Sequence, residues 1–270
     1  MSYFCVFTEE KSRMTPSLSA IQKPVEAHLK RFETMYPEAF SGASVSMEEV
    51  LSYLDTAKEK RLRPMLVFLS AKLFSEPGDA TMRTALFVEM IHTAALVHNN
   101  VMENADVPTA VLTGDFILSK AMLLMAGPDD LPLLREMLGA ALSMSEGELM
   151  ERRTENGERN GEDYYLEVIT RKTAMLFRAC CMGGAMSVGA SKEQVALAGA
   201  FGLNLGMVFQ IRNDILEDDE TTKMAESLLP GYLEKTMAAL EALKTSAAKL
   251  SVEVLESFRD LVSFCAENSH

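Results

Sequence analysis

The feature that most constrains the fold of this chain is a long stretch without proline, which runs from Leu133 to Leu229. Proline ends or kinks helices, because it lacks the backbone donor and its ring clashes with the preceding turn. Leucine, methionine, alanine, glutamate and lysine are frequent throughout the stretch and favour helix. Patterns in which apolar and polar residues alternate, as they do in strands, are scarce. The sequence therefore predicts an all-α protein.

Capping residues and proline-glycine pairs mark the expected helix boundaries. Ser46 and Ser191 each stand three residues before a glutamate or glutamine that can complete a capping box. Breaks are expected at Pro77-Gly78, Gly127-Pro128 and Pro230-Gly231. We expect about ten helices, with boundary errors of about two to four residues. Their ranges are 16–35, 46–58, 62–75, 79–104, 109–126, 129–154, 162–189, 191–219, 231–247 and 250–267.

Composition narrows the possible classes of function. The chain has 270 residues, of which 26 are basic and 39 acidic, and its net charge of −13 argues against a nucleic-acid partner. No secretory signal pattern is present, and no apolar run approaches the roughly 20 residues of a membrane span. Cys5, Cys180, Cys181 and Cys265 lack the spacing of zinc ligands, so we expect reduced, packed thiols. A cytoplasmic protein without a transmembrane segment is expected.

Two short segments share one arrangement of polar residues at positions i, i+1 and i+4, which places the first and third on one face of a helix. These residues are Asn99, Asn100 and Glu103 in the segment 96–103, and Asn213, Asp214 and Glu217 in the segment 209–218. The helices that carry them are apolar on nearly all sides, so we expect both in the middle of a bundle. Facing each other there, the two sets could offer oxygen ligands to a hard cation.

These segments and their surroundings resemble the trans-isoprenyl diphosphate synthases, the all-α enzymes that make farnesyl, geranylgeranyl and longer polyprenyl diphosphates. The resemblance rests on several blocks that follow the family's order. They are KEKRLRPMLVFLSAKLF (58–74), FVEMIHTAALVHNNVMEN (87–104), LTGDFILSKA (112–121), SEGELM (145–150), YLEVITRKTAMLFRACCMGGAMSVGAS (165–191) and FGLNLGMVFQIRNDILE (201–217). It implies an isoprenoid-synthase-type bundle of about ten helices around a central cavity. The expected domain covers residues 1–270, with residues 1–15 poorly ordered.

The resemblance also implies roles for individual residues. In the family an allylic diphosphate ionises, isopentenyl diphosphate attacks the resulting cation, and Mg²⁺ neutralises the departing diphosphate. Lys60, Arg63 and His92 match residues that bind isopentenyl diphosphate, and Lys172, Thr173 and Gln210 match residues that line the allylic pocket. The carboxylates left for metal binding are Glu103, Asp214 and Glu217, and Asn99, Asn100 and Asn213 stand where the family has aspartates. No catalytic residue is assigned.

The chain departs from the family where the chemistry depends on charge. Amides replace carboxylates at three of the six motif positions. At an effective dielectric of about 20, each missing charge about 4 Å from a cation forfeits on the order of 4 kcal/mol per unit of cation charge. The arginine pair expected after the first motif is absent, and Glu151 stands near the place of an expected glutamine. These changes should weaken the assembly of a metal cluster.

Two hypotheses follow. The first is a catalytically impaired homologue that serves as a non-catalytic subunit or binds isopentenyl or prenyl diphosphate without a metal. The alternative is an active, divergent trans-prenyltransferase that condenses isopentenyl diphosphate with an allylic diphosphate, with Mg²⁺ as its cofactor. A purely structural helical protein is a third reading, in which His92 is a core histidine and Lys60, Arg61 and Arg63 form a helix-start charge run. In the family that the chain resembles, the segment matching the apolar residues 109–126 packs across a subunit interface. The resemblance therefore implies a dimer, either with an identical chain or with an active prenyl synthase subunit.

Overall fold

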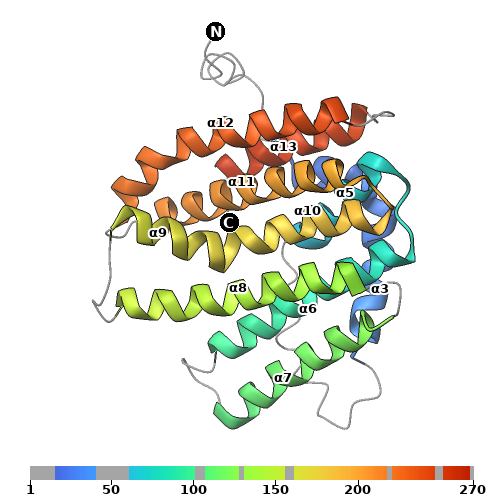
Figure 1. Ribbon diagram of the computed structural model, residues 1–270, viewed down its shortest axis with the longest axis horizontal. Helices are drawn as coiled ribbons and strands as arrows, with labels where there is room; N and C mark the ends of the chain where they lie inside the picture. Colours follow the sequence, from blue (N-terminus) through green and yellow to red (C-terminus); the bar gives the residue numbers. More distant parts are fainter. Residues whose placement is uncertain are drawn as a thin grey trace.

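The computed structural model describes residues 16–40, 61–100, 107–127, 131–155, 161–217, 221–246 and 252–267. Within these ranges every regular element is a helix (Figure 1), which confirms the predicted all-α class. The elements are α2 (Leu18–Gln22), the 3₁₀ turn η1 (Lys23–Val25), α3 (Glu26–Glu38), α5 (Leu62–Phe74), α6 (Asp79–Asn100), α7 (Val107–Leu124), α8 (Leu131–Glu155), α9 (Glu162–Ile169), the π turn η4 (Thr170–Ala174), α10 (Met175–Ser187), α11 (Lys192–Glu217), α12 (Thr222–Ser246) and α13 (Val252–Glu267). The expected helix at 46–58 and its cap at Ser46 lie outside the described residues.

Helices α10 and α11 form the centre of the bundle. α10 packs against α5, α6, α8 and α11, and α12 packs along α11. In Figure 1, α12 and α13 lie along one edge, α7 lies at the opposite edge, and α8 to α11 run between them. The core draws fully buried aromatic rings from many helices, among them Phe32, Phe68, Phe87 and Phe201. Each such side chain contributes about 1.5–3 kcal/mol by leaving water.

The two helices expected in the interior are buried as predicted. Phe87 and Val88 of α6 and Leu205 and Val208 of α11 are inaccessible to solvent. The capping box predicted at Ser191 is also confirmed. The backbone N–H of Gln194 donates to Ser191 Oγ at 3.2 Å, and the backbone N–H of Ser191 donates to Gln194 Oε1 at 2.9 Å.

Three helix boundaries differ from the sequence prediction. α12 begins at Thr222 and continues through Pro230, where a break was expected. Leu229 and Tyr232 pack against the core on either side of this proline, so their burial outweighs the cost of about 3 kcal/mol that proline imposes within a helix. The helix expected at 16–35 is divided by η1, where Pro24 occupies the first turn. The helix expected at 162–189 is interrupted by η4.

One described helix, α11, is long and apolar enough to cross a membrane by length and composition. Half of its most apolar window is buried inside the protein, and the helix packs against α10 and α12. A helix that is apolar all round is also typical of the centre of a large bundle. The membrane criterion is therefore weak support for a span, although this helix is a better candidate than the sequence reading allowed.

The described cysteines behave as packed thiols, as predicted. Cys180, Cys181 and Cys265 are buried and are not part of a disulfide, and Cys5 lies outside the described residues. Burial raises the pKa of the Cys181 thiol to about 12. Because the thiolate is the reactive form, this burial keeps the sulfur unreactive near neutral pH.

Candidate active site

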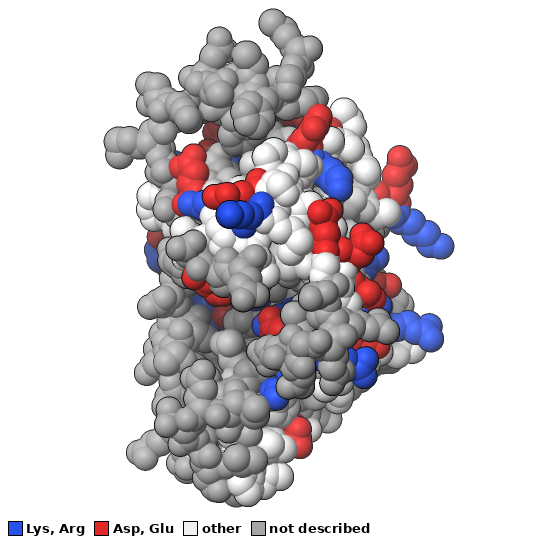
Figure 2. All heavy atoms as spheres, turned by 90° about the vertical axis from the view of Figure 1, so that its left-hand side faces the viewer, with Lys and Arg blue, Asp and Glu red and all other residues white. Residues whose placement is uncertain are grey.

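The two polar motifs stand at the ends of α6 and α11, which finish on the same side of the bundle, at the left of Figure 1. Asn99 and Asn100 form the end of α6. Glu103 and Lys60 lie outside the described residues, as do the side chains of the two asparagines. Figure 2 views the molecule from this side, and its described part carries acidic and basic side chains next to one another.

Hydrogen bonds join three of the predicted site residues in one chain. The Thr173 hydroxyl donates to Gln210 Oε1 at 2.7 Å, and Gln210 Nε2 donates to Asp214 Oδ1 at 2.7 Å. The second oxygen of Asp214 accepts from the Tyr165 hydroxyl at 2.5 Å. Asp214 is only 9% exposed, so these two donors stabilise a carboxylate that has little contact with water. The structure thus brings Thr173, Gln210 and Asp214 together through direct side-chain hydrogen bonds.

Tyr165 was not singled out from the sequence. Its hydroxyl comes from α9, and its partner Asp214 comes from α11. A tyrosine on a helix that is partly buried usually finds a hydrogen-bond partner for its hydroxyl. That rule predicts a bond for Tyr165 but cannot name its partner, because the contact joins residues far apart in the chain.

The other residues of the second motif do not join this chain. Asn213 Oδ1 is buried without a hydrogen-bond partner, and Glu217 is exposed. Among the described residues, no group of three or more histidine, cysteine, aspartate or glutamate side chains lies close enough to hold a metal ion. Within the described residues, the second motif offers one buried carboxylate, Asp214, whose oxygens accept hydrogen bonds from Gln210 and Tyr165.

Lys172 lies on the opposite side of the π turn from that chain, against α8. Its ammonium donates to Glu151 and lies 3.6 Å from Glu148 Oε1. Burial lowers the pKa of Lys172, but the two carboxylates raise it by more, and the pKa is raised on balance. The side chain is therefore a permanent cation whose charge is already paired within the protein.

Close backbone contacts hold the π turn between α8 and α11. A Cβ on Gly147 of α8 would lie 2.5 Å from the backbone nitrogen of Lys172, and a Cβ on Gly206 of α11 would lie 2.7 Å from the Cα of Ala174. Real Cβ contacts are never this short, so both glycines are required for the approach. π turns inside helices are frequent at functional sites. This one directs Lys172 to α8 and Thr173 to α11.

Arg63 and His92 form the second group of predicted site residues. The Arg63 guanidinium lies over the Phe177 ring, with 5.8 Å to the centroid, and its buried Nε has no hydrogen-bond partner. Burial lowers the pKa of Arg63, while the charge of Glu89 acts in the opposite direction. Burial and the nearby Arg63 charge lower the pKa of His92 well below its usual value. His92 is therefore neutral, and its buried Nδ1 also lacks a partner.

A buried ion-pair network beside Arg63 was missed from the sequence, where Arg61 was treated as part of a helix-start charge run. Arg61 adopts a left-handed conformation with φ of 46°. Its guanidinium donates to both carboxylate oxygens of Glu33, at 2.7 and 3.2 Å, and to Glu89 Oε1 at 2.8 Å. The network ties α3, the start of α5 and the middle of α6 together, one turn from His92. It fixes the backbone from which Arg63 projects.

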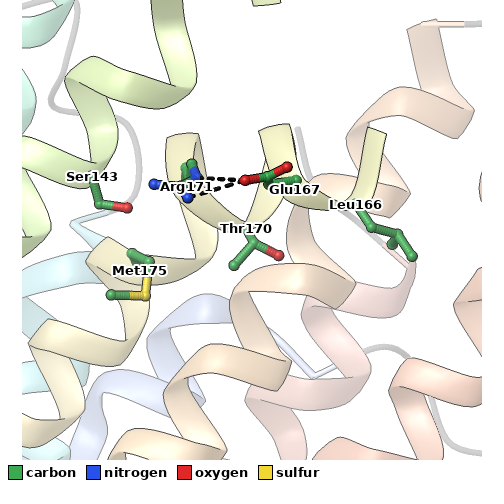
Figure 3. Close-up of a pocket in the computed structure, with 6 residues that line it drawn as sticks. All are labelled: Ser143, Leu166, Glu167, Thr170, Arg171 and Met175. Carbon is green, nitrogen blue, oxygen red and sulfur yellow. Dashed lines mark hydrogen bonds and ion pairs between the residues drawn. The ribbon is translucent and has the colours of Figure 1, made fainter. Parts of the chain in front are cut away.

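A separate pocket of about 450 Å³ opens beside the π turn (Figure 3). It is lined by Ser143, Leu166, Glu167, Thr170, Arg171 and Met175. Arg171 is paired there, donating to Glu167 at 3.0 Å and also to Glu146 of α8. The volume of this pocket is in the range of small-molecule sites. None of the site residues predicted from the sequence lines this pocket.

The sequence of this chain is similar to those of known proteins. The chain matches the family model described as polyprenyl synthetase over residues 44–226. It is 29% identical over 260 residues to geranylfarnesyl diphosphate synthase of Methanosarcina mazei, covering 87% of this chain and 85% of that protein. It is 31% identical over 220 residues to nonaprenyl diphosphate synthase of Mycobacterium tuberculosis, covering 74% of this chain and 65% of that one.

Solved structures agree on the fold. A polyprenyl synthase from Caulobacter crescentus, complexed with calcium and isoprenyl diphosphate, superposes with a TM-score of 0.79 at 22% identity, covering 96% of this chain and all of that chain. A decaprenyl diphosphate synthase from Rhodobacter capsulatus gives a TM-score of 0.77 at 24% identity, covering 93% and 98%. The match of residues 44–226, which is more than half of the chain, shows that this protein belongs to the polyprenyl synthetase family.

Proposed function

We propose that this protein acts in isoprenoid biosynthesis as a trans-prenyltransferase, joining isopentenyl diphosphate to an allylic diphosphate. In this reaction the allylic substrate loses diphosphate, its C1 bonds to the terminal alkene carbon of isopentenyl diphosphate, and a proton leaves the new product. The main support is the family membership of residues 44–226, together with relatives that are named as prenyl diphosphate synthases. The order of the two hypotheses drawn from the sequence is therefore reversed.

The arrangement of side chains gives each substrate a place. Arg63 and His92 would bind the diphosphate of isopentenyl diphosphate, because a buried guanidinium without a hydrogen bond at Nε can meet an anion at little further desolvation cost. Thr173, Gln210 and Asp214 would line the allylic side, with Lys172 next to them in the chain. A neutral His92 would add a hydrogen bond without a charge.

A second candidate is a non-catalytic subunit or a prenyl diphosphate binder. It is favoured by the amides at Asn99, Asn100 and Asn213, and by Asp214, whose two oxygens already accept hydrogen bonds from within the protein. In this reading the fold and the buried Arg63 and His92 side chains are retained, while turnover depends on an active partner subunit.

One assay separates the two candidates. The purified protein is incubated with radiolabelled isopentenyl diphosphate and farnesyl diphosphate, with Mg²⁺ and with EDTA, alone and beside an active synthase from the same cell. Elongated product from the protein alone, lost in the Asp214→Ala variant, supports the transferase. Product that appears or rises only with the partner supports the non-catalytic subunit.

A binding measurement tests the shared part of both candidates. Isopentenyl diphosphate should raise the melting temperature of the protein, and Arg63→Gln should reduce that shift, because the variant removes the buried cation. No shift with isopentenyl diphosphate or pyrophosphate, with or without Mg²⁺, would contradict both and favour a helical protein without a diphosphate ligand.

A further inference from the structure

The ammonium of Lys172 is paired with two carboxylates of α8. It donates to Glu151 and has Glu148 Oε1 within 3.6 Å. The side chains of Lys172, Glu148 and Glu151 are 29%, 23% and 38% exposed, so the group is partly shielded from solvent. Ion pairs that are removed from water are screened less by salt than pairs at the surface.

The charges around Lys172 sum to an acidic site. Glu148 and Glu151 together carry two negative charges against one positive charge on Lys172. A diphosphate must therefore displace a carboxylate of α8 to reach this ammonium.

The two glutamates differ in how strongly they hold the ammonium. Glu151 accepts a hydrogen bond from Lys172, whereas Glu148 lies at ion-pair distance. Glu151 stands one turn beyond Gly147, whose missing side chain lets the backbone of Lys172 approach α8. This close backbone approach places the Lys172 side chain within reach of Glu151.

We propose that Glu151 is a specificity-determining residue that weakens the binding of diphosphate at the Lys172 side of the site by occupying its ammonium. The inference rests on the proposed function, because it concerns the allylic half of the same site. A neutral residue at position 151 releases the ammonium, which then forms a charge-assisted hydrogen bond to a phosphate oxygen.

The test is a titration of the purified protein with inorganic pyrophosphate by isothermal calorimetry, without metal. The variant Glu151→Gln removes the charge and keeps the size and helix propensity of the side chain. We expect two binding phases, of which the phase that Arg63→Gln abolishes is unchanged by Glu151→Gln. The other phase should tighten by about tenfold or more, as expected for loss of a partly buried competing charge.

Glu146→Gln is the matched control. Glu146 lies on the same helix and pairs with Arg171, which lines the separate pocket and not the Lys172 side. Its change should alter neither phase by more than about twofold. Glu148→Gln, which acts on the same ammonium from 3.6 Å, should tighten the same phase by a smaller factor and serves if Glu151→Gln does not fold.

The double variant Glu151→Gln/Lys172→Gln decides whether the effect passes through the ammonium. The tighter binding of pyrophosphate that is expected for Glu151→Gln should be absent in this double variant. A gain that persists, or no gain in either single glutamate variant, overturns the inference while the Arg63-dependent phase leaves the proposed function standing. Absence of both phases in every variant overturns the proposed function itself.

Discussion

At the scale of single residues, the candidate site contains buried and partly buried polar groups that differ in whether they have partners within the protein. Asp214 keeps two donors, Lys172 keeps two carboxylates, and Arg63 and His92 each keep a buried nitrogen without a hydrogen bond. Buried groups that lack partners cost stability, and in native proteins they call for an explanation such as a ligand. The Arg63 and His92 nitrogens are therefore the clearest residue-level mark of a binding site.

We predict that the burial of His92 makes the stability of the protein depend on pH. Burial and Arg63 hold its pKa well below the ordinary value of 6.5. Below pH 6.5 the unfolded chain binds a proton that the folded chain does not, so stability is complete above this pH and is lost as the pH falls toward the folded-state pKa. The loss is up to about 1.4 kcal/mol per pH unit. Urea unfolding at several pH values should show a shallower slope for His92→Gln, and parallel curves would contradict this.

A second prediction concerns the Tyr165 hydroxyl, whose loss should lower the stability of the protein. Tyr165→Phe removes one of the two donors to the buried Asp214 carboxylate, which should lower the free energy of unfolding by about 1–3 kcal/mol. Tyr164→Phe is the neighbouring control, because its hydroxyl donates to a backbone carbonyl, that of Met150. Its cost should be smaller, about 0.5–1.5 kcal/mol. Chemical denaturation of the two variants makes the comparison, and equal losses would argue against a special role for the Asp214 contact.

At the scale of elements, the π turn η4 determines which side of the site each residue serves. A continuous α-helix was expected at 162–189, and nothing in the local sequence distinguishes Thr170–Ala174 from the helix around it. The turn is explained by its neighbours, because Gly147 of α8 and Gly206 of α11 have no side chain and allow its backbone to pack closely against both helices. Sequence periodicity detects a helix, but a local change of pitch depends on tertiary contacts.

Gly147 and Gly139 of α8 provide a matched test of this packing. A Cβ at position 147 would lie 2.5 Å from the backbone nitrogen of Lys172, whereas a Cβ at position 139 meets nothing within 4 Å. Gly147→Ala should therefore destabilise the protein by about 1–3 kcal/mol. Gly139→Ala should stabilise it by about 0.5–1 kcal/mol, because alanine favours helix. Thermal or urea unfolding measures both, and a neutral Gly147→Ala would show that α8 and η4 can separate at little cost.

At the scale of the whole molecule, the fold was largely predictable and the site only in part. The apolar character of α6 and α11 correctly predicted that both helices are buried, and the quoted blocks identified the family. The contacts of Lys172 with Glu148 and Glu151, and of Arg61 with Glu33 and Glu89, could not be predicted, because each joins different helices. Pro230 misled the boundary prediction, since tertiary burial outweighed local propensity.

The predicted dimer is testable on the outer surface of α7. Leu112 and Leu123 are 67% and 73% exposed there, and exposed apolar clusters are typical of protein interfaces. Leu112→Glu/Leu123→Glu should shift the sedimentation of the protein from dimer to monomer. Val252 of α13, 68% exposed, is the control, and Val252→Glu should leave the dimer intact. A wild-type monomer at micromolar concentration would contradict the dimer prediction.

The Arg61 network makes α3 part of the support for the backbone that carries Arg63. Two carboxylates share one guanidinium, and one of them, Glu33, is supplied by α3, which precedes every residue assigned to the site. Loss of α3 would leave Arg61 and Glu89 as an incomplete pair directly beside Arg63. Under the proposed function, a shortened form that begins after α3 should therefore raise its melting temperature less than the 270-residue chain does when isopentenyl diphosphate is added, although every motif of the family is still present in its sequence.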